Sequence, residues 1–218
     1  VLLIRKDNVA SLALADRLGF ARTGTMQDSI SFKRPVPPLT YSDGVVTIRR
    51  RHVSDLDQDL AAKDDEQQRW LWQPDERQLW AAMDDAARRA HALKHLASNH
   101  EAFGSGPKWT FSVDAREADN VGYVDCDLAN ENLKLGGVAF GDANISYASH
   151  PGHRGRGYIS RAVRLVLQFL AEHTGVLSAH LVIEPENQAS LRVAHALDAV
   201  AVGKFRSMDG PELLHHKL

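Results

Sequence analysis

A segment that occurs twice is the feature of this sequence that most constrains its fold. Val1–Leu18 aligns without a gap with His180–Leu197. The identical pairs include Ile4 with Ile183, Asn8 with Asn187, Ala10 with Ala189, Ser11 with Ser190, Leu12 with Leu191, Ala15 with Ala194 and Leu18 with Leu197. In each copy a short aliphatic run precedes a polar turn and a helix-forming segment, so the same strand–helix unit is predicted twice.

The repeat also indicates the domain organisation. Its first copy lies at the start of the chain and its second near the end, so the first lacks everything that precedes the unit in the second. We therefore expect residues 1–34 to be the C-terminal portion of a first domain and residues 44–218 to be a complete second domain. Residues 35–43, with their prolines and turn residues, are the expected linker. Chance similarity between two short strand–helix units is the alternative.

Hydrophobic periodicity in residues 44–218 predicts alternating strands and helices. Strands are expected at 45–51, 108–113, 121–128, 144–149, 179–183, 200–205 and 212–217. Helices are expected after a capping signal at Ser54-Asp55, over 75–97, after Gly157 and over 188–197. The helix after Gly157 has the strongest signal, because apolar residues recur there at steps of three and four. This order predicts a mixed α/β sheet with helices packed on it.

Composition excludes several other classes. With 44% hydrophobic and 25% charged residues the chain has the balance of a globular protein, and its net charge of −2 argues against a nucleic-acid partner. No apolar run approaches the roughly 18 residues of a membrane span, and no signal-peptide pattern is present, so a cytoplasmic location without membrane contact is expected. His91 and His95 are four residues apart, but no third ligand accompanies them, and no metal site is predicted.

The sharpest local motif is a glycine- and arginine-rich turn. The segment 150–160, His-Pro-Gly-His-Arg-Gly-Arg-Gly-Tyr-Ile-Ser, joins a predicted strand to the helix after Gly157. The first amides of a helix have no partner within it and attract anions. Gly155 lacks a Cβ and lets the backbone approach a phosphate closely, while Arg154 and Arg156 add positive charge. No acid lies between residues 143 and 171. The segment therefore predicts a phosphate-binding turn, with a plain surface turn as the alternative.

Two motifs together resemble a known family. Arg154-Gly-Arg-Gly-Tyr-Ile159, followed by a buried strand and by Glu186-Asn-Gln-Ala-Ser190, resembles the GCN5-related N-acetyltransferase (GNAT) superfamily. The sequence segment that contains Tyr147, His150 and Pro151 is most similar to that of the ribosomal-protein N-terminal acetyltransferases. The resemblance covers Gly44–Leu218. It implies a GNAT-like mixed, mostly antiparallel central sheet with helices on both faces, and acetyl-CoA or coenzyme A as the cofactor.

The same resemblance implies a cofactor site, and this chain departs from the family's pattern at two positions. Its residues are Ser149, Arg154, Gly155, Arg156, Gly157, Tyr158, Ile159, Ser160 and Asn187. The family has a small residue where this chain has Ile159, whose branched side chain is expected to crowd the start of the helix. Ala194 stands where many relatives have tyrosine. Residues 1–34 look like the last quarter of a second such domain, a tandem arrangement that also occurs in mycothiol synthases.

Acetylation of an amine by a thioester needs few protein groups. The amine must be neutral to attack, the oxyanion must be stabilised, and the leaving thiolate must receive a proton or hydrogen bond. The resemblance implies that a bulged strand over Tyr147–His150 supplies backbone donors. Ser190 is the candidate for the acid, with helix packing as the alternative. His150 is the first candidate for the base, since a histidine titrates near pH 6.5. The other candidates are Asp142, Asp125 and Asp127.

The acceptor side is less constrained. Ten acids lie between residues 54 and 85 against three bases, which predicts a pocket mouth that attracts a cationic amine, or else a solvated helix face. They are Asp55, Asp57, Asp59, Asp64, Asp65, Glu66, Asp75, Glu76, Asp84 and Asp85. Trp70, Trp72 and Trp80 occupy the region where the family's first two helices wall the acceptor pocket; packing in the core is the alternative.

These observations predict an acetyl-CoA-dependent N-acetyltransferase. Its acceptor is expected to be a primary amine of a small molecule or a protein N-terminus, acetylated by direct transfer, and a homodimer is a further expectation. The alternative is a degenerate GNAT-like domain that binds coenzyme A, or nothing, and serves as a scaffold or regulatory domain. A tandem enzyme similar to the mycothiol synthases is a less favoured alternative.

Overall fold

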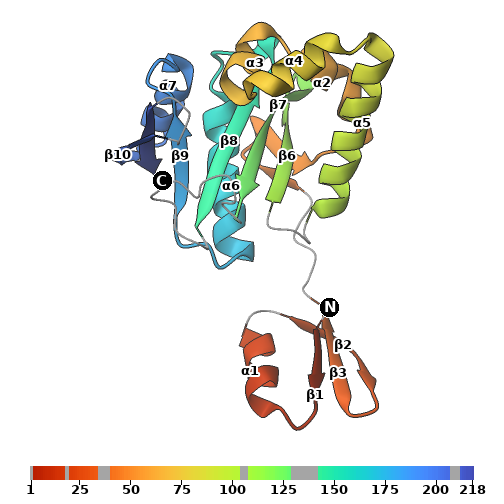
Figure 1. Ribbon diagram of the computed structural model, residues 1–218. Helices are drawn as coiled ribbons and strands as arrows, with labels where there is room; N and C mark the ends of the chain where they lie inside the picture. Colours follow the sequence, from red (N-terminus) through yellow and green to blue (C-terminus); the bar gives the residue numbers. More distant parts are fainter. Residues whose placement is uncertain (1, 18–19, 34–39, 104–107, 129–141, 207–211) are drawn as a thin grey trace. The chain divides into compact units, whose positions relative to one another are not determined.

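A computed structural model describes residues 2–17, 20–33, 40–103, 108–128, 142–206 and 212–218 (Figure 1). The chain divides into two compact units, Val1–Pro38 and Leu39–Leu218. Of the expected linker, residues 35–39 lie outside the described residues. Thr40–Ser42 forms strand β4, which pairs antiparallel with β5 (Val46–Arg50), so this part of the expected linker belongs to the larger unit.

The smaller unit is one helix on a three-stranded sheet. Its elements are β1 (Leu2–Arg5), α1 (Val9–Arg17), β2 (Ala21–Met26) and β3 (Ser29–Lys33). Both neighbours in the order β1-β3-β2 are antiparallel. Phe32 of β3 and Ala15 of α1 are buried in this unit.

The larger unit has an eight-stranded sheet in the order β10-β11-β9-β8-β7-β6-β5-β4. Its remaining strands are β6 (Lys108–Ala115), β7 (Ala118–Asp127), β8 (Ala143–Ser149), β9 (Ala179–Ile183), β10 (Val200–Arg206) and β11 (Glu212–Lys217). Only β8 and β9 are parallel among these pairs. The predicted fold class, a mixed and mostly antiparallel sheet with helices, is therefore confirmed.

Six α-helices accompany this sheet in the described part of the larger unit. They are α2 (Leu56–Ala61), α3 (Asp65–Leu71), α4 (Pro74–Ala82), α5 (Asp85–Ala102), α6 (Tyr158–His173) and α7 (Gln188–Ala196). Five successive residues of β6, from Trp109 to Val113, are buried, which requires cover on both faces of the sheet. The apolar stripe of α6 supplies part of this cover, since Val163, Val166 and Phe169 are fully buried in the main core.

The sequence repeat is also a structural repeat. In the larger unit β9, α7, β10 and β11 follow one another as β1, α1, β2 and β3 do, and the strand orders match. Both hairpins have a register shift at the equivalent place, between Arg22 and Gly24 and between Ala201 and Gly203. The assignment of the smaller unit to a truncated first domain stays a prediction.

Two expected helices differ from the structure because of local caps. The helix expected over 75–97 is divided into α4 and α5, since the Asp84 carboxylate accepts a hydrogen bond from the Ala87 amide at 2.8 Å and starts a new helix there. Near Ser54 the cap is His52, which precedes a 3₁₀ turn over Val53–Asp55. Helix α3 was not expected; it begins at the cap Asp64, inside the acidic run.

Gly122 makes a close approach possible between β7, the end of β8 and the first turn of α6. A Cβ at this position would lie 2.4 Å from the carbonyl oxygen of Ala148 and 3.1 Å from the side chain of Ile159. The strand at this point has room only for glycine. We expect Gly122→Ala to lower the free energy of unfolding by about 1–3 kcal/mol, the usual range for overpacking. Urea denaturation checks this against Gly175→Ala, where a Cβ meets nothing within 4 Å.

A buried carboxylate makes stability depend on pH. Asp55 is 3% exposed and accepts hydrogen bonds from Arg49 at 2.7 and 3.0 Å, from the Ser112 hydroxyl at 2.7 Å and from the His52 amide at 3.0 Å. Burial alone raises the pKa of Asp55, but these hydrogen bonds outweigh it, and the pKa lies below the ordinary 3.8.

A depressed carboxyl pKa contributes stability that is complete above the ordinary Asp value and is lost as the pH falls through the folded-state pKa. We therefore expect the free energy of unfolding to fall with acidification below about pH 4, and Asp55→Asn to flatten this slope. Thermal unfolding at several pH values measures it, with Asp75→Asn, on the exposed start of α4, as the control. An unchanged slope in Asp55→Asn would contradict the assignment.

Candidate active site

The site lies where the two parallel strands of the sheet separate. β8 pairs with β9 only through Ala143–Ala179 and Asn144–His180, although β8 stays paired with β7 as far as Ser149. A cavity of about 630 Å³ opens at the carboxyl ends of the two strands. It is lined by the end of β8, the turn before α6, the first residues of α6, the start of α7 and one face of α3. In α/β sheets this edge is the usual place for a ligand.

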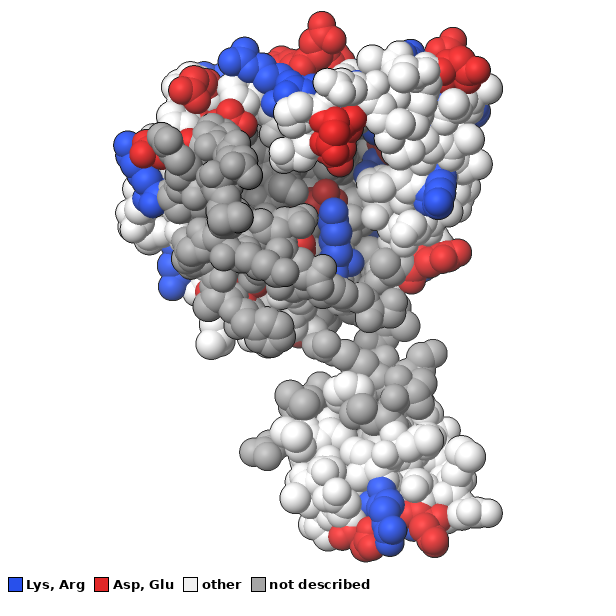
Figure 2. Space-filling model, viewed as in Figure 1, with Lys and Arg blue, Asp and Glu red and all other residues white. Residues whose placement is uncertain are grey.

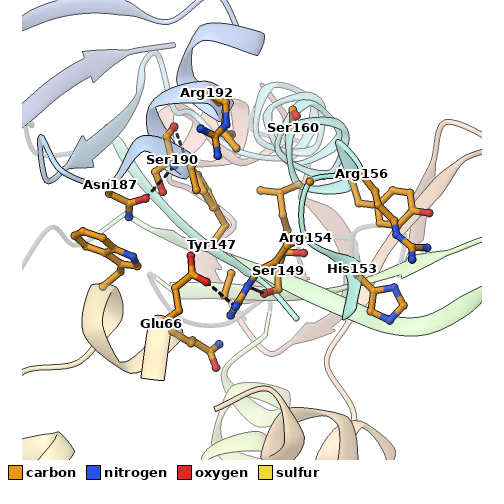
Figure 3. A pocket seen from close by; sticks show the side chains of 18 of the residues that line it. Glu66, Tyr147, Ser149, His153, Arg154, Arg156, Ser160, Asn187, Ser190 and Arg192 are labelled. Atoms are coloured by element: carbon orange, nitrogen blue, oxygen red, sulfur yellow. Dashed lines mark hydrogen bonds and ion pairs between the residues drawn. The ribbon is translucent and has the colours of Figure 1, made fainter. Parts of the chain in front are cut away.

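The turn before α6 has the geometry of an anion site. Gly157 is the N-cap of α6 at φ 76°, and Gly155 has φ 74°, so both adopt the left-handed conformation that favours glycine. A Cβ on either residue would meet nothing within 4 Å, and both line the cavity. No side chain caps this helix, and its first amides are available to a ligand. The predicted residues from Arg154 to Ser160 are thus brought together on one wall (Figure 3).

The expected crowding by Ile159 does not occur. Its side chain is 7% exposed and belongs to the main core, where it lies against the space left by Gly122. The side chain therefore points into the sheet while the residue still contributes to the cavity wall. Ser160 is buried beside it, and its hydroxyl donates to the Gly157 carbonyl at 3.4 Å.

The arginines of the acid-free run all have partners outside that run. Both terminal nitrogens of the Arg154 guanidinium donate to Asp64 at 2.7 Å, and Nη1 also lies 2.7 Å from Glu66. The Nε group donates to the Ser149 carbonyl at 3.3 Å. Arg156 pairs with Glu117 at 3.3 Å. Arg161 pairs with Asp43 at 2.7 Å, and Arg164 donates to a backbone carbonyl. The positive charge that the run suggests is therefore largely neutralised by distant acids.

Helix α7 forms the opposite wall. The Asn187 carboxamide caps this helix by accepting from the Ser190 amide at 3.0 Å, and both residues line the cavity. The Tyr147 hydroxyl, on β8, donates to the Ser190 carbonyl at 3.3 Å, while burial raises the pKa of Tyr147 to about 12. Sequence reasoning missed Arg192, an exposed arginine on the same wall. In the sequence, the only feature that could have marked Arg192 as a site residue is its position two residues after Ser190.

The predicted base is not in the cavity. His150 is 5% exposed, and its Nε2 lies 3.8 Å from the Asp59 carboxylate beneath the turn. Burial lowers the pKa of His150, so this ring is neutral at neutral pH. Asp142 is bonded to His180 at 3.0 Å, and neither Asp125 nor Asp127 lines the cavity. The structure thus places the predicted base and its alternatives elsewhere.

The expected bulge in β8 is also absent up to Ser149. β7 and β8 pair without a register shift from Asn144 to Ser149. The backbone groups that the bulge was expected to free instead face the gap left by β9. Tyr147 and Ser149 line that gap without a distortion of the ladder.

The acidic region expected to attract a cation is mostly paired. Arginines outside this run pair with six of the ten acids, namely Asp55, Asp57, Asp59, Asp64, Glu66 and Asp85. Figure 2 shows acidic and basic side chains interspersed on the drawn face of the larger unit, without a patch of one sign among the described residues. Of the three tryptophans only Trp70 lines the cavity, since Trp72 and Trp80 pack on each other at 5.3 Å between ring centroids.

Comparison with known proteins identifies the family. The model of the acetyltransferase (GNAT) domain matches residues 46–200. The chain therefore belongs to the GNAT acetyltransferase family. No curated protein matches the sequence.

Solved structures share the fold at low sequence identity. The microcin C7 self-immunity acetyltransferase MccE, solved with acetyl-CoA and AMP, is 11% identical over 84% of this chain and 97% of its own, with a TM-score of 0.61. RimJ from Mycobacterium smegmatis, solved with CoA-disulfide, is 17% identical over 80% and 82%, with a TM-score of 0.61. Ribosomal-protein-S5-alanine acetyltransferase from Vibrio fischeri is 15% identical over 83% and 96%, with a TM-score of 0.63.

Two kinds of feature are absent from the described residues. No helix among them has both the length and the apolar character needed to cross a bilayer. Within the same part of the chain, no group of three or more His, Cys, Asp or Glu side chains is arranged to hold a metal ion.

The left-handed Gly157 gives a direct test of the turn. We expect Gly157→Val to abolish coenzyme A binding, because a β-branched residue at φ 76° is strained and its side chain enters the cavity wall. Calorimetric titration with coenzyme A measures the loss, and far-UV circular dichroism verifies the fold. The matched control is Gly152→Ala, since a Cβ there meets nothing within 4 Å and Gly152 does not line the cavity. Equal affinities in the two variants would exclude the turn from the site.

Proposed function

We propose that this chain is an acetyl-CoA-dependent N-acetyltransferase that transfers the acetyl group directly to a primary amine. One observation carries the proposal: the uncapped N-terminus of α6, with Gly155 and Gly157 in left-handed conformations, opens onto the gap between β8 and β9. A diphosphate fits backbone amides arranged in this way. Members of the family solved with acetyl-CoA or CoA-disulfide share this fold.

The residues present also fit the rest of the cofactor. The cavity is lined by polar groups at the turn and is partly apolar between Tyr147 and Val193. Arg154, Arg156 and Arg192 are the cations on its walls, and each can turn toward a phosphate. Asn187 keeps its amide nitrogen available, because its carboxamide oxygen caps α7.

Bound acetyl-CoA would supply the activated acetyl group, and the chain's own residues would orient the reaction. The gap between the strands exposes backbone of Tyr147–Ser149 to the thioester. Ser190 is the proposed donor to the leaving sulfur, because it lines the cavity on α7 opposite β8. Tyr147 holds the Ser190 backbone through its hydroxyl. A hydrogen bond to the departing thiolate lowers the barrier to its release.

The proposed acceptor enters beside α3, where Trp70, Glu66 and Gln67 line the cavity. A peptide N-terminus or a small primary amine fits an opening of this kind. The similarity to ribosomal-protein acetyltransferases supports a protein N-terminus as the first acceptor to test.

The decisive experiment is calorimetric titration with acetyl-CoA, followed by measurement of thiol release with a panel of peptide and small-molecule amines. We expect saturable binding and amine-dependent release. Absence of binding would overturn the proposal. Binding without release for every amine would support the alternative, a non-catalytic scaffold domain. Ala194, buried where many relatives have tyrosine, is the observation that favours this alternative.

The role of Ser190 gives a separate prediction. We expect Ser190→Ala to reduce kcat by about 10–100-fold, at the lower end of the range for general acids, with little change in the Kd of acetyl-CoA. The amide cap from Asn187 is retained, because it uses the Ser190 backbone. Steady-state kinetics measures the effect, with Ser98→Ala on an exposed part of α5 as the control. A variant with unchanged kcat would show that Ser190 only completes the wall.

A further inference from the structure

One guanidinium joins the cofactor turn to α3. Arg154 belongs to the turn, and its side chain extends toward Glu66 and Asp64 at the start of α3 (Figure 3). Three contacts of 2.7 Å hold it there. These hydrogen bonds keep the pKa of Asp64 below its ordinary value. In this state the Arg154 guanidinium is held by carboxylates at the α3 wall of the cavity.

The carboxylates around Arg154 outnumber it. Asp64 alone can satisfy the guanidinium with two parallel hydrogen bonds, which is the preferred geometry for this pair. Glu66 is the additional partner and the more exposed of the two acids. Two carboxylates and one guanidinium leave one negative charge at this wall. Glu66 is therefore able to bind a second cation, and fully so when Arg154 leaves.

Gln67 provides an independent sign of a ligand at this wall. Its side chain is 7% exposed and lines the cavity, yet its Oε1 has no hydrogen-bond partner among the described residues. The Nε2 group lies 3.5 Å from the Tyr123 hydroxyl, at the long limit of a hydrogen bond. A buried oxygen without a donor is costly, so a ligand that brings N–H groups is its natural complement. Together Glu66 and Gln67 present hydrogen-bond acceptors, which suit a protonated amine.

We propose that Glu66 and Gln67 receive the protonated amine of the acceptor, and that Arg154 occupies this place until the phosphates of the cofactor draw its guanidinium back to the turn. The inference rests on the proposed acetyl transfer. In the exchange the Arg154 guanidinium leaves Asp64 and Glu66, while its backbone stays in the turn that carries Gly155 and Gly157. Its departure opens the cationic subsite for the acceptor.

Coenzyme A affinity tests the exchange without any acceptor. Asp64→Asn and Glu66→Gln each remove one competitor for Arg154, and we expect each to bind coenzyme A about 3–10-fold more tightly than the wild type. Asparagine at position 64 can still cap α3, so the helix is retained. Asp57→Asn makes the same change of charge on α2, where the carboxylate pairs with Arg89 and does not line the cavity. Its affinity should equal that of the wild type.

Unchanged or weaker affinity in both Asp64→Asn and Glu66→Gln would overturn the exchange. A gain that Asp57→Asn shares would also overturn it, because the effect would then follow net charge alone.

The acceptor subsite is tested by thiol release from acetyl-CoA with three acceptors: alanyl-arginine amide, alanyl-alanine amide and alanyl-glutamate. We expect Glu66→Gln to lower kcat/KM at least tenfold for the best of the three, mainly through KM of the amine, while its coenzyme A affinity rises. Opposite effects of one substitution on the two ligands are not expected from a merely structural change. Full activity in Glu66→Gln would overturn the subsite.

Failure of the proposed function has a different outcome. If no variant binds coenzyme A, both the function and this inference are wrong. If all variants bind it and none acetylates any acceptor, the transferase function and the acceptor subsite are wrong, while the affinities still decide the exchange of Arg154. If Asp64→Asn and Glu66→Gln bind coenzyme A and the wild type does not, the exchange is supported in its strongest form.

Discussion

The separation of β8 from β9 is the constraint on which the site depends. The two strands share two pairs at their amino ends, and each is held on its other edge, β8 by β7 and β9 by β11. The gap cannot close unless one of these ladders breaks. Because α6 follows β8 and α7 follows β9, the amino ends of both helices reach the same opening. Gly122 on β7 completes the arrangement, since only a residue without a Cβ leaves room for the end of β8 and the side chain of Ile159.

Charge in this protein is organised by the fold and not by sequence neighbourhood. The acidic run between residues 54 and 85 and the acid-free run between 143 and 171 each look like a one-sign surface when read along the chain. In the structure Arg154 of the second run binds Asp64 and Glu66 of the first. A pair of this kind at a partly exposed site is worth little in stability. In the proposed exchange its importance is functional, because the carboxylates compete with an anion that enters the cavity.

Elements with strong periodicity or a distinctive turn were predictable from sequence, and elements set by single caps were not. The stripe of α6 and the glycine pattern before it identified a helix and its start, since these depend on neighbouring residues. The anion site at that start stays a prediction. Asp84 and Asp64 start new helices within the acidic region, and nothing in a run of carboxylates tells which of them will cap. His150 has the right chemistry for a base, but its burial beside Asp59 depends on packing between distant segments. Glu66 and Gln67 reach the cavity for the same kind of reason, and no local pattern marks them.

The two copies of the repeat allow a structural role to be separated from a functional one. Asn8 caps α1 through the Ser11 amide at 3.1 Å, and Asn187 caps α7 through the Ser190 amide at 3.0 Å. Among the described residues β1 has no parallel neighbour equivalent to β8, so the first cap exists without a gap between diverging strands. The asparagine and the serine amide are therefore needed to start the helix in both copies. What distinguishes the second copy is its place beside β8. The Asn-x-x-Ser motif shows only that the helix has a cap. It becomes evidence for a site when the neighbouring strand diverges from the strand before that helix.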